Sequence, residues 1–140
     1  MKTVLLTLTL LFTMSFVAQD KYDVLIEKTG MIKEVKTFVN KYIDKLATQS
    51  NGVTQSQWET IKTKIDYSAY FIGIKAILQN NYTIAELNQI FLSNDMLDSV
   101  NDTGVFIYKP KPEVKEQMYK TSRAFGKLLN VQIKKLIKDL

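Results

Sequence analysis

The stretch from Tyr82 to Phe91, YTIAELNQIF, contains the start of a helix together with that helix's apolar face. Thr83 is placed to accept a hydrogen bond from the backbone N–H three residues on, and Glu86 can reach back to the N–H of Thr83. Tyr82 and Leu87 hold the two positions of a hydrophobic staple around this capping box. The stretch therefore predicts a helix that begins directly after Thr83. These residues direct folding, and none of them indicates a catalytic or binding role.

The same pattern occurs a second time at residues 53–58, VTQSQW. Thr54 is the expected N-cap and Gln57 closes the box, while Val53 and Trp58 hold the staple positions. Two capped helix starts in one short chain indicate a helical protein.

The composition is that of one ordinary globular domain, and it removes several classes of chemistry. The chain has 140 residues, of which 46% are hydrophobic and 24% charged. It contains no Cys and no His, so disulfides, thiol nucleophiles, thiolate metal sites and the commonest general base are all absent. The net charge of +5 is mild and argues against nucleic acid as a partner.

Residues 1–18 have the pattern of a secretory signal peptide. Lys2 supplies the positive start, an apolar run extends from Val4 to Val17, and Ala18 is a small residue before the expected cut. An uncleaved anchor is the alternative, although the run is shorter than the roughly 20 residues that a spanning helix needs. The sequence predicts export to the periplasm or outside the cell, with residues 19–140 as a single domain.

Helical spacing recurs along the rest of the chain. We expect a short helix that ends at Gly30, an amphipathic helix over residues 31–46, and a helix from Thr54 with a restart at Asp66. The helix that begins at Thr83 is followed by a polar stretch from Ser93 to Thr103, for which we expect an irregular loop.

The chain closes with its longest apolar pattern. Residues 105–108 form a short apolar run that fits a buried turn or an extended piece, and Pro112 suits the first turn of a helix that continues to the C-terminus. The fold class expected is all-α, a compact bundle of five or six helices with a long C-terminal amphipathic helix. Three basic residues share one side of that last helix, opposite most of its apolar positions: Lys127, Lys134 and Lys138.

The acidic and aromatic residues that attract attention have structural interpretations. Glu86 and Asp66 fit helix caps better than catalysis. Asp95, Asp98 and Asp102 lack the glycine turn and the closing glutamate of a calcium loop, so an unliganded polar loop is favoured. The aromatic stripe fits a core, with a ligand groove as the alternative; its members are Tyr67, Tyr70, Phe71, Tyr82 and Phe91.

The order of several motifs resembles a family of small exported bacterial proteins catalogued as domain of unknown function family 2059. The similar segments are residues 25–30 (LIEKTG), Trp58 with Ile65 and Asp66, residues 82–87 (YTIAEL), and Pro112 before a long amphipathic helix. The chain departs from the family after Phe91, where a longer polar insertion replaces a short turn. The resemblance implies an exported all-helical domain and carries no activity, cofactor or site.

These observations predict a non-catalytic binding or interaction module of the bacterial cell envelope. The expected partner is an envelope protein or an apolar ligand, held by a helical groove or by the region after Phe91. The alternative is a peripheral binder of anionic membrane or glycan surfaces through Lys127, Lys134 and Lys138. An enzyme that depends on Asp and Glu ranks third. No catalytic residue, cofactor or metal ligand is expected.

Overall fold

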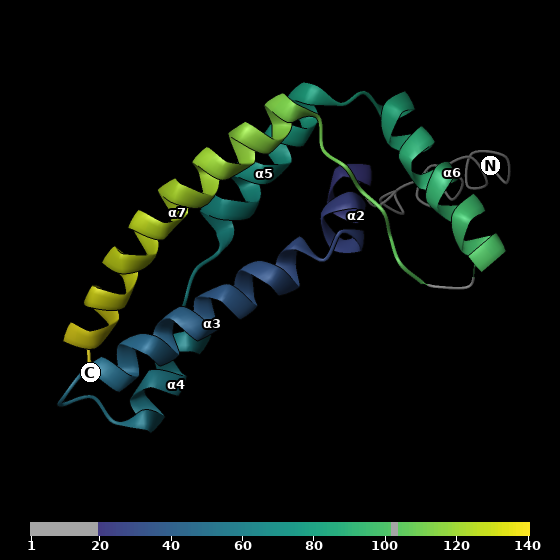
Figure 1. Ribbon diagram of the computed structural model, residues 1–140. Helices are drawn as coiled ribbons and strands as arrows, with labels where there is room; N and C mark the ends of the chain where they lie inside the picture. Colours follow the sequence, from purple (N-terminus) through teal and green to yellow (C-terminus); the bar gives the residue numbers. More distant parts are fainter. Residues whose placement is uncertain (1–19, 102–103) are drawn as a thin grey trace, which may run out of the picture.

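The computed structural model describes residues 20–101 and 104–140, and of residues 99–101 only the backbone. In this part of the chain there are six α-helices and no strand, which confirms the all-α class and the long last helix (Figure 1). The helices are α2 (Lys21–Lys28), α3 (Met31–Gln49), α4 (Gln55–Thr63), α5 (Ser68–Asn81), α6 (Ile84–Asn101) and α7 (Pro112–Lys138). The signal peptide predicted at residues 1–18 lies outside the described residues.

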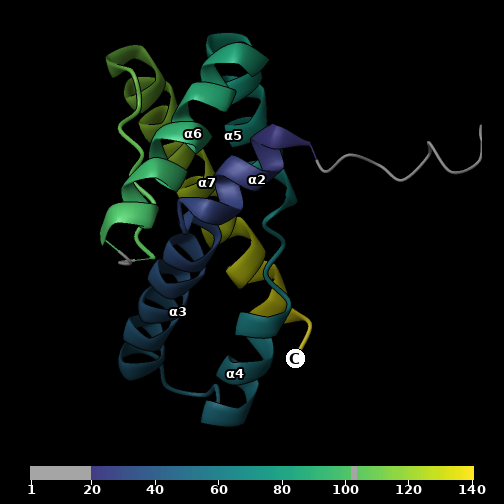
Figure 2. The ribbon, with the colours of Figure 1, turned by 90° about the vertical axis from the view of Figure 1, so that its right-hand side faces the viewer.

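The helices form an arch. Helix α5 packs along α7, α4 lies against both α3 and α7, and α2 contacts α3, α5 and α6. Figures 1 and 2 both place α6 and α4 at opposite ends of the molecule. The tightest contact is between α5 and α7, where a Cβ on Gly73 would lie 3.0 Å from the Thr121 Cγ2 atom.

Both predicted capping boxes are present. The backbone N–H of Gln57 donates to the Thr54 hydroxyl, and the Gln57 side chain accepts from the N–H of Thr54 at 2.8 Å. Thr83 and Glu86 repeat this pair of bonds at the start of α6. Gly30 has a φ of 74°, the left-handed conformation expected where α2 ends and α3 begins.

The expected loop from Ser93 to Thr103 is wrong for most of its length, because α6 continues through Asn101. The helix continues because of a tertiary contact made by Asn94. Asn94, which reads as a loop former, is 7% exposed, and its side-chain amide donates to the carbonyls of Ile90 and Ile107, both at 2.9 Å. The same side chain accepts from the N–H of Ile107, so the polar residue is satisfied within the helix. Thr103 lies outside the described residues.

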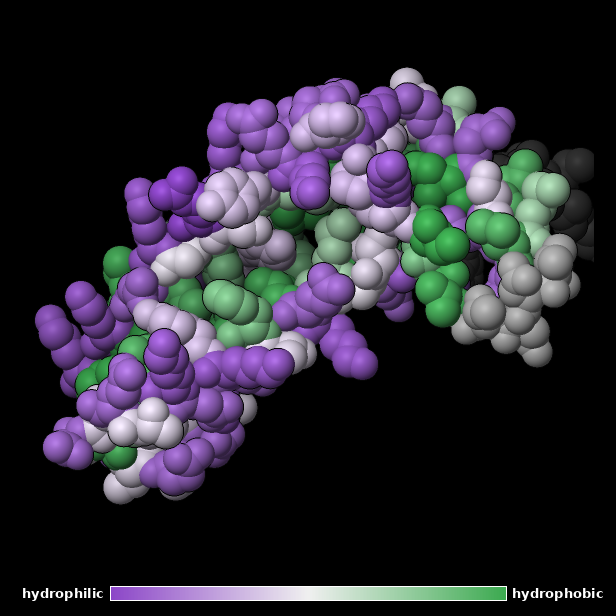
Figure 3. Space-filling view, in the orientation of Figure 1, coloured by the Kyte–Doolittle hydropathy of each residue, from purple (hydrophilic) through white to green (hydrophobic). Residues whose placement is uncertain are grey.

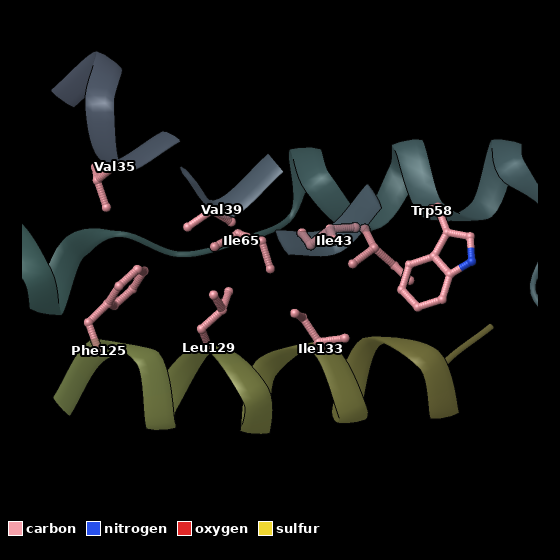
Figure 4. Close-up of a cluster of buried hydrophobic side chains, with 9 residues drawn as sticks. Val35, Val39, Ile43, Trp58, Ile65, Phe125, Leu129 and Ile133 are labelled. Atoms are coloured by element: carbon pink, nitrogen blue, oxygen red, sulfur yellow. The ribbon is translucent and has the colours of Figure 1, made fainter. Parts of the chain in front are cut away.

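Two buried clusters hold the arch together. The first, the α3–α7 cluster, fills the space between these helices, with α3, α4 and α7 each contributing (Figure 4). Its buried members are Val35, Val39, Ile43, Trp58, Ile61, Ile65, Phe125, Leu129 and Ile133. The second, the α2 cluster, joins α2, α5, α6 and the start of α7 around Leu25, Leu78, Leu87 and Val114. Tyr70 and Phe71 pack against both clusters and connect them.

Several apolar residues expected inside lie on the surface. Ile72, in the apolar sequence of α5, is 69% exposed, because it lies on the side of α5 away from the buried Ile74, Ile77 and Leu78. Leu128 in α7 and Leu140 beyond its end are 39% and 51% exposed, although both belong to the apolar pattern of the C-terminal sequence. Residues 105–108 are extended, with Phe106 and Tyr108 turned inward and Val105 and Ile107 outward, which excludes the buried turn.

Candidate functional site

An apolar groove runs between α3 and α7, with α5 contributing to its wall. Its volume is about 310 Å³, at the lower end of the range for small-molecule sites. Figure 3 shows apolar side chains gathered in the hollow of the arch, with hydrophilic residues along both rims. The groove is lined by Met31, Glu34, Val35, Phe38, Tyr70, Ser122, Phe125, Gly126 and Leu129.

The groove exists because α3 and α7 face each other without direct backbone packing. No Cα atom of α3 lies within 8 Å of a Cα atom of α7, so only side chains bridge the two helices. In Figure 4, Val35 faces Phe125, Val39 faces Leu129 and Ile43 faces Ile133 across this space. The arrangement leaves an accessible apolar surface beside the buried contacts.

Gly126 contributes to the opening. It lies in the interior of α7, where glycine costs roughly 0.5–1 kcal/mol relative to alanine. A Cβ on Gly126 would have no heavy atom within 4 Å, in contrast to the Cβ on Gly73. Close helix packing therefore does not require this glycine, and a larger side chain here would project into free space at the groove wall.

Phe38 forms part of the opposite wall and is 67% exposed. The sequence places Phe38 in the apolar repeat of residues 32–46, so burial was expected, but the gap between α3 and α7 leaves it open to solvent. Phe38 thus adds an accessible aromatic ring to the apolar lining of the groove.

The predicted aromatic stripe divides into separate groups. Tyr70 lines the groove, and its ring centroid lies 5.2 Å from that of Phe125. Tyr67 also stacks on Phe125, at 5.7 Å. Phe91 pairs with Phe106 at 5.9 Å in the other half of the molecule. Core packing thus accounts for most of the stripe, and the groove uses one member of it.

The structure places Glu86 in a cap, as the sequence predicts, and adds a partner that the sequence did not reveal. Lys111 donates to Glu86 Oε1 at 2.8 Å and to the Asn81 carbonyl at 2.7 Å. The hydrogen bond from Lys111, with a second from the Thr83 N–H, lowers the pKa of Glu86 to about 2. The carboxylate is therefore ionised and engaged at neutral pH.

Tyr82 is the centre of this polar cluster. Its hydroxyl accepts from the backbone N–H of Lys111 at 3.0 Å and from the Tyr108 hydroxyl at 3.3 Å, and the Lys111 ammonium lies 4.6 Å from its ring centroid. Burial, followed by the bond to Tyr82, raises the pKa of Tyr108. Tyr22 donates to the Tyr82 carbonyl at 2.8 Å. The cluster joins α2, α6 and the segment before α7, which is a structural role.

The other acidic residues singled out from the sequence, where the structure describes them, make hydrogen bonds within turns or lie apart from one another. At the start of α5, Asp66 Oδ1 accepts from the Ser68 hydroxyl and from the Ser68 N–H, and these two bonds, the hydroxyl's first, lower the pKa of Asp66. Asp98 accepts from the Gly104 N–H. Asp102 lies outside the described residues. Among the described residues, no three His, Cys, Asp or Glu side chains are grouped so as to hold a metal ion.

Lys127, Lys134 and Lys138 are exposed on one side of α7, as their spacing predicts. Val131, 63% exposed, lies between them in the sequence. The structure does not bring these lysines to the groove lining. They form a separate surface, the basic face of α7.

None of the helices in the described part of the chain has the length and hydropathy to cross a membrane. Comparisons with family models, with curated proteins and with solved structures give no match. The resemblance to family 2059 therefore stays a prediction.

Proposed function

We propose that this protein is a non-catalytic binding module that holds an apolar ligand in the groove between α3 and α7. The observation that carries the proposal is the combination of an apolar groove with Gly126 in one wall and the 67% exposed Phe38 in the other. Glycine weakens a helix, and an exposed phenylalanine forgoes the roughly 1.5–3 kcal/mol that burial of its side chain would contribute. A ligand in the groove would bury the Phe38 ring and would use the space that Gly126 leaves open.

The composition supports binding over catalysis. The chain contains no His and no Cys, and Glu86 and Asp66, the acidic residues singled out from the sequence, make hydrogen bonds within caps and turns. The groove itself contains a single carboxylate, that of Glu34, whereas glycosidase-type chemistry uses a pair.

The test is binding of a neutral apolar fluorophore, N-phenylnaphthylamine, to the protein and to Gly126→Leu. A leucine at this position projects toward the groove, and since a steric conflict costs roughly 1–3 kcal/mol, we expect about tenfold weaker binding. Replacing a helical glycine stabilises the helix, so the variant should remain folded, as circular dichroism will check.

The matched control is Ala76→Leu, which adds the same side chain to an exposed position of α5 outside the groove. We expect its affinity for the fluorophore to equal that of the unmodified protein. Equal binding by all three proteins would show that the fluorophore binds elsewhere, and absence of binding by the unmodified protein would refute the proposal.

A second candidate function is attachment to anionic membrane or glycan surfaces through the basic face of α7. The observation in its favour is the exposure of Lys127, Lys134 and Lys138 on one side of the helix. We rank it second because the apolar side of the same helix is used in the core.

We also propose that the protein acts in the cell envelope after export. The support is the pattern of residues 1–18 in the sequence. N-terminal sequencing of protein from the envelope fraction should begin at or near Gln19. Protein that retains Met1 would contradict this.

A further inference from the structure

The two ends of the groove differ in chemistry. Near one end, the Tyr42 hydroxyl donates to Asn130 Oδ1 at 2.6 Å and so joins α3 to α7. Tyr42 lies one turn beyond Phe38 on α3, and Asn130 one turn beyond Gly126 on α7, so the bridge crosses the gap directly after the groove. The bridge therefore marks the end of the groove beyond Leu129.

The other end offers hydrogen-bond acceptors beside the apolar Met31 at the start of α3. Glu34 and Ser122 line it, both exposed, and Glu34 is the one charged residue among the described lining residues. The Ser122 hydroxyl donates to the Met118 carbonyl at 2.9 Å, which leaves its oxygen to accept from a ligand. A carboxylate and a hydroxyl oxygen at the mouth favour a donor or a cation.

Basic residues that neighbour this mouth in the sequence do not line the groove. Lys33 and Lys41 line a neighbouring hollow, which Glu34 also borders, and do not line the groove. The Arg123 guanidinium lies 5.8 Å from the ring centroid of Tyr119, one turn earlier on α7. The net charge of the whole chain, +5, acts in the opposite direction and favours anions. The carboxylate at the groove mouth thus favours a cationic ligand, whereas the net charge of the chain favours an anionic one.

The size of the groove limits the apolar part of the ligand. At about 30 Å³ for each water-sized group, a volume of about 310 Å³ holds a single aliphatic chain or one small ring system. We infer that the groove binds an amphiphile with one aliphatic chain and a cationic head group, the chain directed toward Leu129 and the head at Glu34 and Ser122. This inference rests on the proposed function.

The experiment compares two amphiphiles of equal chain length, decyltrimethylammonium and decanoate, as competitors of bound N-phenylnaphthylamine below their micellar concentrations. We expect decyltrimethylammonium to displace the fluorophore at about two- to fivefold lower concentration, the range given by an exposed ion pair. In Glu34→Gln this preference should vanish or reverse. Glu113→Gln removes the same charge from the exposed first turn of α7 and should keep the preference.

Each result separates this inference from the proposed function. If decanoate competes as well as decyltrimethylammonium, or better, the groove binds apolar chains without the head-group selectivity and the inference is wrong. An unchanged preference in Glu34→Gln would also overturn it, because the charge would then act elsewhere. If neither amphiphile displaces a bound fluorophore, or the fluorophore does not bind, the proposed function fails as well.

Discussion

At the scale of single residues, Glu86 connects two parts of the chain that lie 25 positions apart. One carboxylate oxygen accepts from the Thr83 N–H and closes the cap of α6, and the other accepts from the Lys111 ammonium. The sequence reveals the cap, because its partners are three residues apart. It does not reveal Lys111, since that contact depends on how residues 104–111 return across α6.

The stability that Glu86 confers should depend on pH in a defined direction. Its pKa is about 2 in the folded protein against an ordinary value of 4.5, so the unfolded chain takes up the proton first as pH falls. The stabilising contribution is complete above about pH 4.5 and is lost between that value and about pH 2. The difference in urea midpoint between the unmodified protein and Glu86→Gln should be constant at higher pH and shrink over this interval.

The second capping box supplies a control for this experiment. Gln57 closes that box without a titrating group, so the effect of Thr54→Ala should stay about 1 kcal/mol across the same pH range. A Glu86→Gln difference that persists unchanged to pH 2 would show that the ion pair with Lys111 does not form in solution.

At the scale of elements, helix starts were predictable and the extent of α6 was not. The capping boxes at Thr54 and Thr83 are formed by residues three positions apart, so the local sequence is sufficient to predict them. The second half of α6 contains Ser, Asn and Asp, which favour turns on their own. The spacing of Leu87, Ile90 and Asn94 nevertheless places Asn94 on the buried face. Its amide holds Ile107, a contact that no local pattern encodes.

Asn94→Ala should release residues 104–108 from α6. The substitution leaves the N–H and the carbonyl of Ile107 without their partner, and we expect it to cost roughly 2 kcal/mol of unfolding free energy. Hydrogen exchange should increase in peptides that cover residues 104–110 and stay unchanged in α3 and α4. Gln89→Ala, at an exposed position of the same helix, is the control and should leave exchange as it was. Protection of Ile107 that survives in Asn94→Ala would contradict this role.

At the scale of the whole molecule, the candidate groove could not be predicted from the sequence. Its walls come from α3 and α7, and the bridge at its end joins Tyr42 and Asn130, 88 residues apart. The apolar repeats predict that both helices pack, but the distance at which they pack is set by the side chains between them, such as Ile65 (Figure 4). Gly126 is the sequence feature that could have indicated the groove, since an isolated glycine in a helical pattern often has a packing or functional reason.

The packing of α7 against α3 also favours the groove over the basic face of α7 as the binding surface. Stable attachment of a helix to a membrane needs an apolar face free to insert in addition to basic residues. In α7 that face is occupied, because Phe125, Leu129 and Ile133 are 6%, 2% and 3% exposed. The accessible apolar residues near the lysines are Val131, Leu128 and Leu140, at 63%, 39% and 51% exposure, and these three side chains give a small apolar surface for insertion.

We therefore expect the protein without residues 1–18 to bind anionic vesicles weakly, by electrostatics alone. In sedimentation with phosphatidylserine vesicles, the bound fraction should be small at low salt and vanish near physiological ionic strength, where the Debye length is about 8 Å. Replacing Lys127, Lys134 and Lys138 with glutamine should remove the binding at low salt, whereas the affinity for N-phenylnaphthylamine should not change, because none of the three lines the groove. Strong sedimentation that persists at physiological salt and disappears in the triple variant would make the basic face the primary surface, and would displace the groove from that position.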